Sequence, residues 1–251
     1  MEQFLQNKLQ NSQDAFQKWR KIPFEERQKY FTQLSEILNN RKQEFGEIIT
    51  KEMNKPISQS VSEIEKCAAL CDYYAAAENI LKTEQVETEF QISEIHHEPL
   101  GVILGVMPWN FPFWQAIRFA VPTILAGNVI VLKHASICEK SGETMQEIFE
   151  EAGFPKGVFT FLKVSHTEVE EMIAHPIISG VSLTGSEAAG RKIAETAGKN
   201  LKKCVLELGG SDAFIVCEDA DVSKAAIDGA QARLQNNGQT CVAGKRFIIH
   251  E

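Results

Sequence analysis

From residue 100 onward, short apolar runs alternate with segments of helical pattern, which strongly restricts how the chain can fold. The runs expected to be strands are 102–107, 129–132, 158–162, 181–183 and 213–216, and the clearest intervening helices are 114–125, 138–152 and 187–197. Strands that alternate with helices indicate a parallel sheet with both faces covered. The sequence therefore predicts an α/β fold with a Rossmann-like parallel sheet and flanking helices.

The ends of the chain have a different pattern. Residues 1 to about 80 carry apolar residues at helical spacing, and Pro23 suits the first turn of a helix. Residues 86–98 look extended, with Phe90 and Ile92 on one face. Residues 247–249 read as a strand for which no partner follows along the chain, so we expect a unit that begins at 207 to be incomplete.

Charge and composition limit the partners. The net charge of −8 argues against a nucleic-acid partner, because phosphate binding requires a basic face. No run approaches the roughly 18 apolar residues of a membrane span, and the N-terminus has no apolar signal core, so the expected location is cytoplasmic.

The six cysteines fit neither a zinc site nor a disulfide scaffold, and we expect most of them to be buried. His96 and His97 would point to opposite faces of a strand, so no metal site is expected.

Four parts of the chain carry candidate chemistry. They are MPWNFPFW (107–114), VLKHAS (131–136), LTGSE (183–187) with VLELGGSD (205–212), and NNGQTCVAGKR (236–246). Each has a structural alternative when it is taken singly, such as a turn, a solvated lysine, a glycine-rich loop or one more buried cysteine.

Together these segments contain the parts of a thiol-based active site. Cys241 lies on a glycine-containing loop, where a thiol nucleophile needs a base and a donor that stabilises charge. Glu207 ends an apolar run, and burial there would raise its pKa toward the range of a general base. The amide of Asn110 suits a developing oxyanion. Lys133 and Ser136 follow a strand, at the edge where open parallel sheets bind ligands.

In order and spacing, the four segments resemble the aldehyde dehydrogenase superfamily over essentially the whole chain. The ELGG and GQTC elements, 34 positions apart from Glu207 to Cys241, are the most specific part of the resemblance. VLKHAS, LKKCVLELGGSD and GKRFIIHE are most similar to the bacterial succinate-semialdehyde dehydrogenase branch. The resemblance implies the aldehyde dehydrogenase fold with a truncated catalytic domain. It divides the chain into N-terminal helices plus a dinucleotide-binding domain at 1–206 and the start of the catalytic domain at 207–251.

The resemblance also implies a reaction and roles for individual residues. Cys241 would attack an aldehyde, succinate semialdehyde in the first instance, while Asn110 and the backbone N–H of Cys241 hold the oxyanion. Hydride transfer to NAD or NADP would leave a thioester, and Glu207 would activate the water that hydrolyses it. The residues implied in cofactor binding are Trp109, Asn110, Lys133, Ser136, Gly185 and Ser186, with the last two near the pyrophosphate at a helix N-terminus.

Two positions affect the choice of cofactor and substrate. Ser136 replaces the glutamate of strongly NAD-preferring relatives, which removes repulsion of a 2′-phosphate and favours use of both cofactors. Arg118 occupies the place of an arginine that binds the substrate carboxylate in succinate-semialdehyde dehydrogenases, although a structural salt bridge is an equal alternative. Gln235 stands where some of that branch has a second arginine, which leaves other small aldehydes open.

Members of the superfamily continue about 200 residues further, typical of another domain. We therefore expect this chain to be a fragment that lacks activity alone, with the complete form a homo-oligomer. The alternative is a catalytically inactive remnant that still binds a nucleotide.

Overall fold

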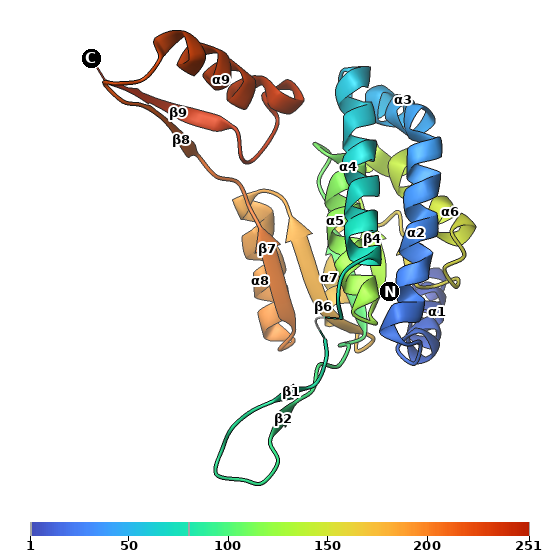
Figure 1. Cartoon of the computed structure of the whole chain (residues 1–251). Coiled ribbons are helices and arrows are strands. Elements are labelled where there is room, and N and C mark those ends of the chain that lie inside the picture. Colours follow the sequence, from blue (N-terminus) through green and yellow to red (C-terminus); the bar gives the residue numbers. More distant parts are fainter. Residues whose placement is uncertain (1, 80, 251) are drawn as a thin grey trace.

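The computed structural model describes residues 2–79 and 81–250, beginning with a layer of helices (Figure 1). Helices α1 (Gln3–Trp19), α2 (Phe24–Asn40), α3 (Lys42–Met53) and α4 (Ile57–Ala75) confirm the helical prediction for this part of the chain. Each helix turns an apolar stripe inward, as Phe31, Leu34 and Leu38 do in α2. Pro23 is the residue that precedes α2 rather than part of its first turn.

A five-stranded parallel sheet forms the centre of the molecule, and its strand order is β5-β4-β3-β6-β7. The strands are β3 (Val102–Val106), β4 (Val129–Lys133), β5 (Phe159–Phe161), β6 (Ile178–Thr184) and β7 (Lys203–Glu207). The chain extends the sheet from β3 to β5 on one side and then returns to add β6 and β7 on the other. The predicted Rossmann-like α/β fold is confirmed, with its topological switch point between β3 and β6.

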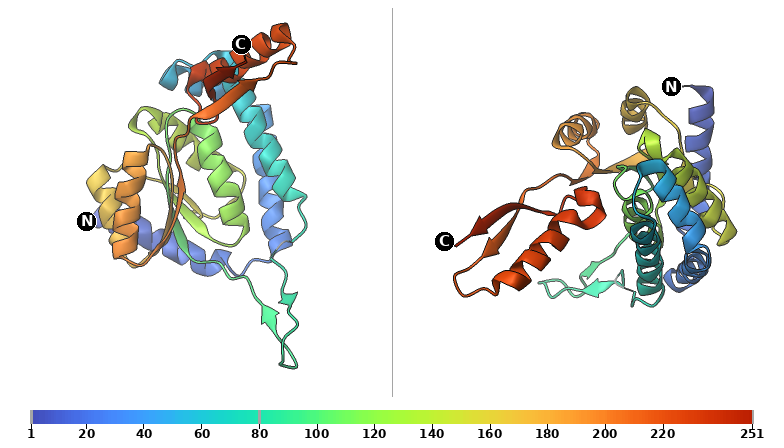
Figure 2. Two further views of the ribbon diagram at one scale, coloured as in Figure 1. Left: turned by 90° about the vertical axis from the view of Figure 1, so that its left-hand side faces the viewer. Right: turned by 90° about the horizontal axis from the view of Figure 1, so that it is seen from above.

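Helices cover both faces of this sheet, as parallel strands require. They are α5 (Pro112–Leu125), α6 (Glu139–Glu151), α7 (His166–Ala174) and α8 (Glu187–Lys199), with the short 3₁₀ helix η1 (Ser136–Cys138) before α6. Figure 2 shows α5 and α8 on opposite faces. Strands β3 and β4 are almost fully buried, so the core lies where they meet α1 and α5.

The extended interpretation of residues 86–98 is confirmed only in part, because β2 is the one strand of the structure within these residues. The segment belongs to a projecting arm whose antiparallel strands, β1 (Glu84–Gln85) and β2 (Glu94–Ile95), have only two residues each (Figure 1). The side chains of Phe90 and Ile92 are 70% and 75% exposed, so the apolar alternation has no face of the core to pack against.

Residues beyond β7 form a small separate layer beside the upper end of α4 (Figure 2). It consists of β8 (Asp212–Val216), α9 (Val222–Leu234), the 3₁₀ turn η2 (Gln235–Gly238) and β9 (Gly244–Ile249). The final strand does have a partner, since β9 pairs in parallel with β8. Its apolar side chains remain exposed, however, including Phe247 at 45% and Ile249 at 64%.

The cysteines are divided between the core and more accessible positions. Cys67, Cys71 and Cys138 are buried, but the other three cysteines are half-buried or exposed, so burial holds for half of them rather than most. Among the described residues, no helix is long and apolar enough to cross a membrane.

Candidate active site

Cys241 lies on the loop between η2 and β9, where it is half-buried. The preceding residue, Thr240, is only 6% exposed and fixes this part of the loop against the body of the molecule. Two cavities adjoin at Cys241, because this residue belongs to the lining of both. Such a position lets two ligands lie next to one residue.

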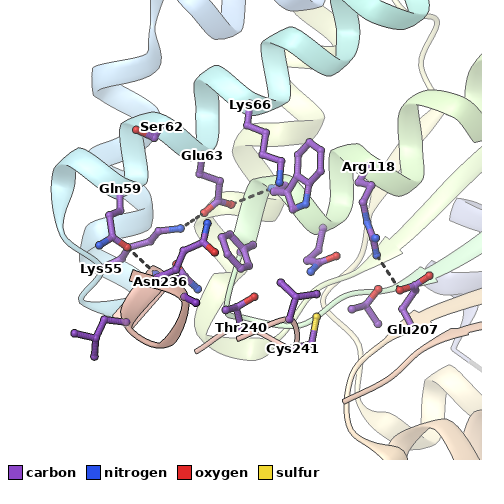
Figure 3. Close-up of a pocket in the computed structure, with 18 of the residues that line it drawn as sticks. Lys55, Gln59, Ser62, Glu63, Lys66, Arg118, Glu207, Asn236, Thr240 and Cys241 are labelled. Carbon is purple, nitrogen blue, oxygen red and sulfur yellow. Dashed lines mark hydrogen bonds and ion pairs between the residues drawn. The ribbon is translucent and has the colours of Figure 1, made fainter. Parts of the chain in front are cut away.

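The first cavity, of about 970 Å³, opens between α4, α5 and the cysteine loop (Figure 3). It brings Arg118 and Glu207, two of the residues expected from sequence, together with Cys241. Gln235 also lines it, as does Lys66, whose ammonium lies 3.9 Å from the ring centroid of Trp114. The lining carries charges of both signs, since Lys55, Lys66 and Arg118 are cationic and Glu63, Glu207 and Asp228 are acidic.

Glu207 ends β7 and faces Arg118, with 3.6 Å between its Oε2 and the Arg118 Nη2 (Figure 3). The expectation that Glu207 is buried is wrong, because its side chain is 55% exposed. As the last residue of the edge strand β7, it has a neighbouring strand on one side only. Both alternatives for Arg118 thus have support, since it lines the cavity and also forms an ion pair.

The second cavity lies at the carboxyl edge of the sheet, at the switch point between β3 and β6. Its lining contains Trp109 and Asn110 after β3, Gly185 and Ser186 after β6, and Cys241. Successive loops of a parallel sheet meet at this edge, so segments more than 50 residues apart in the chain become neighbours.

Asn110 is held against the cysteine loop. Its amide Nδ2 donates to the carbonyl oxygen of Gln239 at 2.8 Å, two residues before Cys241. One amide proton is used in this bond, and the second remains for another acceptor. This arrangement holds the Asn110 amide beside the loop that carries Cys241, which suits a donor to an oxyanion.

The N-terminus of α8 presents donors to the second cavity. Ser186 is the N-cap, and its Oγ accepts the Ala189 N–H at 3.2 Å. Lys133 and Ser136 lie at the carboxyl end of β4, further along the same edge. They are not among the described residues that line the two cavities. Partial burial lowers the pKa of Lys133.

Polar residues in and around α4 form contacts that the sequence analysis missed. The Lys55 ammonium and the Glu63 carboxylate form an ion pair of 2.5 Å in which both side chains are 1% exposed. Burial raises the pKa of Glu63, and the charge of Lys55 counteracts this effect. Gln59 and Asn236 form a further contact beside the pair. The sequence does contain a signal for these contacts, because Gln59 and Glu63 lie four residues apart on the buried side of a predicted helix.

No group of three potential metal ligands occurs among residues 2–79 and 81–250. His96 and His97 face different carboxylates, those of Glu94 and Glu84.

Comparison with known proteins identifies the family of this chain. The sequence model of the aldehyde dehydrogenase family matches residues 3–251, and the chain therefore belongs to that family. A probable NADP-dependent succinate-semialdehyde dehydrogenase of Synechocystis sp. is 48% identical over 96% of this chain and 54% of the relative. The succinate semialdehyde dehydrogenase Sad of Escherichia coli, named as using NAD(P), is 44% identical over 98% of this chain and 54% of its own length.

Solved structures give the same result. The succinic semialdehyde dehydrogenase of Streptococcus pyogenes, solved in complex with NADP, superposes with a TM-score of 0.96 and 42% identity. The match covers 99% of this chain and 55% of that structure. This chain therefore spans about half the length of the relatives that it matches.

Proposed function

We propose that this chain supplies the thiol nucleophile, the oxyanion donor, the base and the cofactor-binding edge of an NAD(P)-dependent aldehyde dehydrogenase. The observation that carries the proposal is the position of Cys241 between two cavities. One contains Arg118 and Glu207, and the other contains Asn110 and the N-terminal end of α8. The aldehyde would bind to the sulfur from one cavity, and the hydride would pass from the same carbon to the dinucleotide in the other cavity.

The reaction begins when the Cys241 thiolate forms a bond from its sulfur to the aldehyde carbon, giving a thiohemiacetal. The carbonyl electron pair moves to oxygen, where the free amide proton of Asn110 stabilises the negative charge. Loss of hydride from the carbon leaves a thioester on Cys241. Glu207 takes a proton from water, whose oxygen attacks the thioester, and cleavage of the carbon–sulfur bond releases the acid and restores the thiolate.

The carboxyl edge of the sheet fits a dinucleotide. Its switch-point position, the N-terminus of α8 and the Ser186 cap provide donors for a pyrophosphate, and Lys133 adds a cation along the same edge. Ser136 presents no negative charge to a 2′-phosphate, so we propose that NADP is accepted as well as NAD. When bound, NAD(P) supplies the hydride acceptor.

Succinate semialdehyde is the substrate that we propose. Arg118 is cationic, lines the cavity beside Cys241 and has a planar fork that matches a carboxylate. Three relatives described above bear the name of that activity. Because Gln235 is uncharged, the carboxylate would depend on Arg118, with Lys66 on the same wall.

A second candidate is a nucleotide-binding protein without turnover. Strands β3 and β4 of the sheet are almost fully buried, whereas the layer after β7 that carries Cys241 leaves Val222 and Ile249 exposed at 75% and 64%. Binding of NADP with no production of NADPH would favour this candidate.

The deciding experiment compares cysteine variants in the whole natural protein that contains this chain. Cys241→Ala is expected to lower NAD(P)H production from succinate semialdehyde by on the order of 1000-fold or more, while cofactor binding stays close to that of the parent. Cys204→Ala and Cys217→Ala serve as matched controls with little expected effect. Activity of Cys241→Ala within tenfold of the parent would contradict the assignment.

A further inference from the structure

Asn236 has an unusual environment for a polar residue in a loop. Asn236 lies five positions before Cys241 and is only 1% exposed. Its backbone is left-handed, with φ 54° and ψ 46°, a conformation that asparagine and glycine tolerate better than other residues. The next residue, Asn237, has nearly the same φ of 55° but is exposed.

The amide of Asn236 joins the two loops that meet at the thiol. Its Nδ2 donates to the carbonyl oxygen of Asn110 at 2.7 Å and to that of Gln239 at 3.2 Å. The Gln239 carbonyl also accepts from the side chain of Asn110 at 2.8 Å. Asn236 therefore uses its amide group to hold both the residue that would bind the oxyanion and the loop that carries Cys241.

Helix α4 holds this group of residues from the other side (Figure 3). Gln59 Oε1 accepts the backbone N–H of Asn236 at 2.9 Å. One turn later, Glu63 Oε1 accepts the N–H groups of Phe113 and Trp114, each at 2.9 Å, in the first turn of α5. One helix thus fixes the segment that follows Asn110 and the segment that precedes Cys241.

We propose that Asn236 is a positioning residue that acts through Asn110, setting the oxyanion donor at the correct place relative to the Cys241 sulfur. The inference rests on the proposed function and adds a residue to it. Loss of the Asn236 amide frees the Asn110 carbonyl, so that the Asn110 side chain is anchored only by its own bond to Gln239. A misplacement of about 1 Å at a reacting centre can lower a rate on the order of 100-fold.

The variants separate the side chain from the backbone. Asn236→Gly keeps the left-handed conformation and removes the two donated hydrogen bonds. Asn236→Asp keeps the shape but turns a carboxylate oxygen toward two carbonyl oxygens, so a larger effect is expected. Asn237→Gly is the matched control, because its side chain donates to the Asn54 carbonyl at 3.3 Å, away from the thiol.

In the whole natural protein, Asn236→Gly is expected to lower kcat for aldehyde oxidation about 10- to 100-fold, with the KM for NADP changed less than twofold. The kcat of Asn237→Gly should stay within about threefold of the parent.

A double-mutant cycle with Asn110→Ala distinguishes a positioning role from general destabilisation. Because Asn236 acts through Asn110, adding Asn236→Gly to the Asn110→Ala variant should lower kcat by less than about a further threefold. Fully multiplicative losses would overturn the inference.

A second measurement does not depend on turnover. The alkylation rate of Cys241 by iodoacetamide, followed by mass spectrometry of its peptide, should stay within about threefold of the parent in both Asn236→Gly and Asn237→Gly, because alkylation forms no oxyanion and does not need the Asn110 donor. A change of about tenfold or more in Asn236→Gly alone would overturn the inference, because Asn236 would then act on the thiol itself. If Cys241→Ala remains active, the proposed function fails instead. If Cys241→Ala is inactive but Asn236→Gly matches the parent, only the positioning role fails.

Discussion

Ser136 begins η1 at the carboxyl end of β4, three residues after Lys133. If this pair holds the adenosine ribose, the charge at position 136 controls acceptance of a 2′-phosphate. Ser136→Glu is expected to raise the KM for NADP at least tenfold and to change that for NAD less than threefold, because a carboxylate repels the phosphate. Steady-state kinetics with each cofactor in the whole natural protein measure this difference. Ser136→Gln is the uncharged control, and equal penalties for both cofactors would show that this position does not discriminate.

The identity of several site residues could be predicted from the sequence more easily than their surroundings could. The sequence pointed to Cys241, Asn110 and Arg118 from short local motifs, and the structure brings them to two adjoining cavities. The burial of Glu207 was wrong because exposure depends on which strands flank β7, and no local pattern records that. Asn236 was overlooked for a similar reason, since its partner Asn110 is 126 positions away.

At the level of elements, Glu63 of α4 forms a buried ion pair with Lys55, which precedes the helix, and also accepts the N–H groups of Phe113 and Trp114 in α5. Lys55→Met would leave the Glu63 carboxylate buried without its counter-charge. We expect the free energy of unfolding to fall by about 3–5 kcal/mol, as for other broken buried pairs. Chemical denaturation followed by circular dichroism measures this change.

The same helix offers a matched control for that prediction. Glu65 pairs with Lys42 at 2.6 Å, but both side chains are more than 40% exposed. Lys42→Met should therefore cost no more than about 1 kcal/mol. Similar losses for the two variants would mean that burial does not govern the contribution of the Lys55–Glu63 pair.

Elements with strong periodicity were predictable, and weakly patterned ones were not. The buried strands β3 and β4 follow directly from continuous apolar runs, because a central parallel strand is covered on both faces. Helix α7 was missed although Ser165 and Glu168 form a capping box at its start, a signal present in the sequence. The extended pattern of the β1–β2 arm gives only two-residue strands, because its apolar alternation occurs outside the core.

At the scale of the whole molecule, the layer made by β8, α9 and β9 has an uncovered apolar surface. Val222, Phe247 and Ile249 are exposed at 75%, 45% and 64%. We expect purified residues 1–251 to self-associate through this surface, because apolar strands without cover pair or aggregate. Light scattering coupled to gel filtration measures the association.

A charge on the layer should weaken that association. Ile249→Lys is expected to raise the dissociation constant at least about tenfold, equivalent to about 1.4 kcal/mol. Leu201→Lys is the control, since Leu201 is 96% exposed but lies after α8, outside the layer. A monomeric parent protein, or equal weakening by the two variants, would contradict this prediction.

The position of the β1–β2 arm has a consequence for the continuity of the chain. The arm joins α4 to β3 and carries exposed backbone at residues 86–93, the kind of site that proteases cut first. A single cut there separates the four N-terminal helices from the sheet. The two pieces nevertheless share one core, and the Trp19 indole donates to the Ile124 carbonyl at 2.8 Å across the division. The nicked protein should stay together, and the arm marks the natural place to divide this chain into two polypeptides that reassemble.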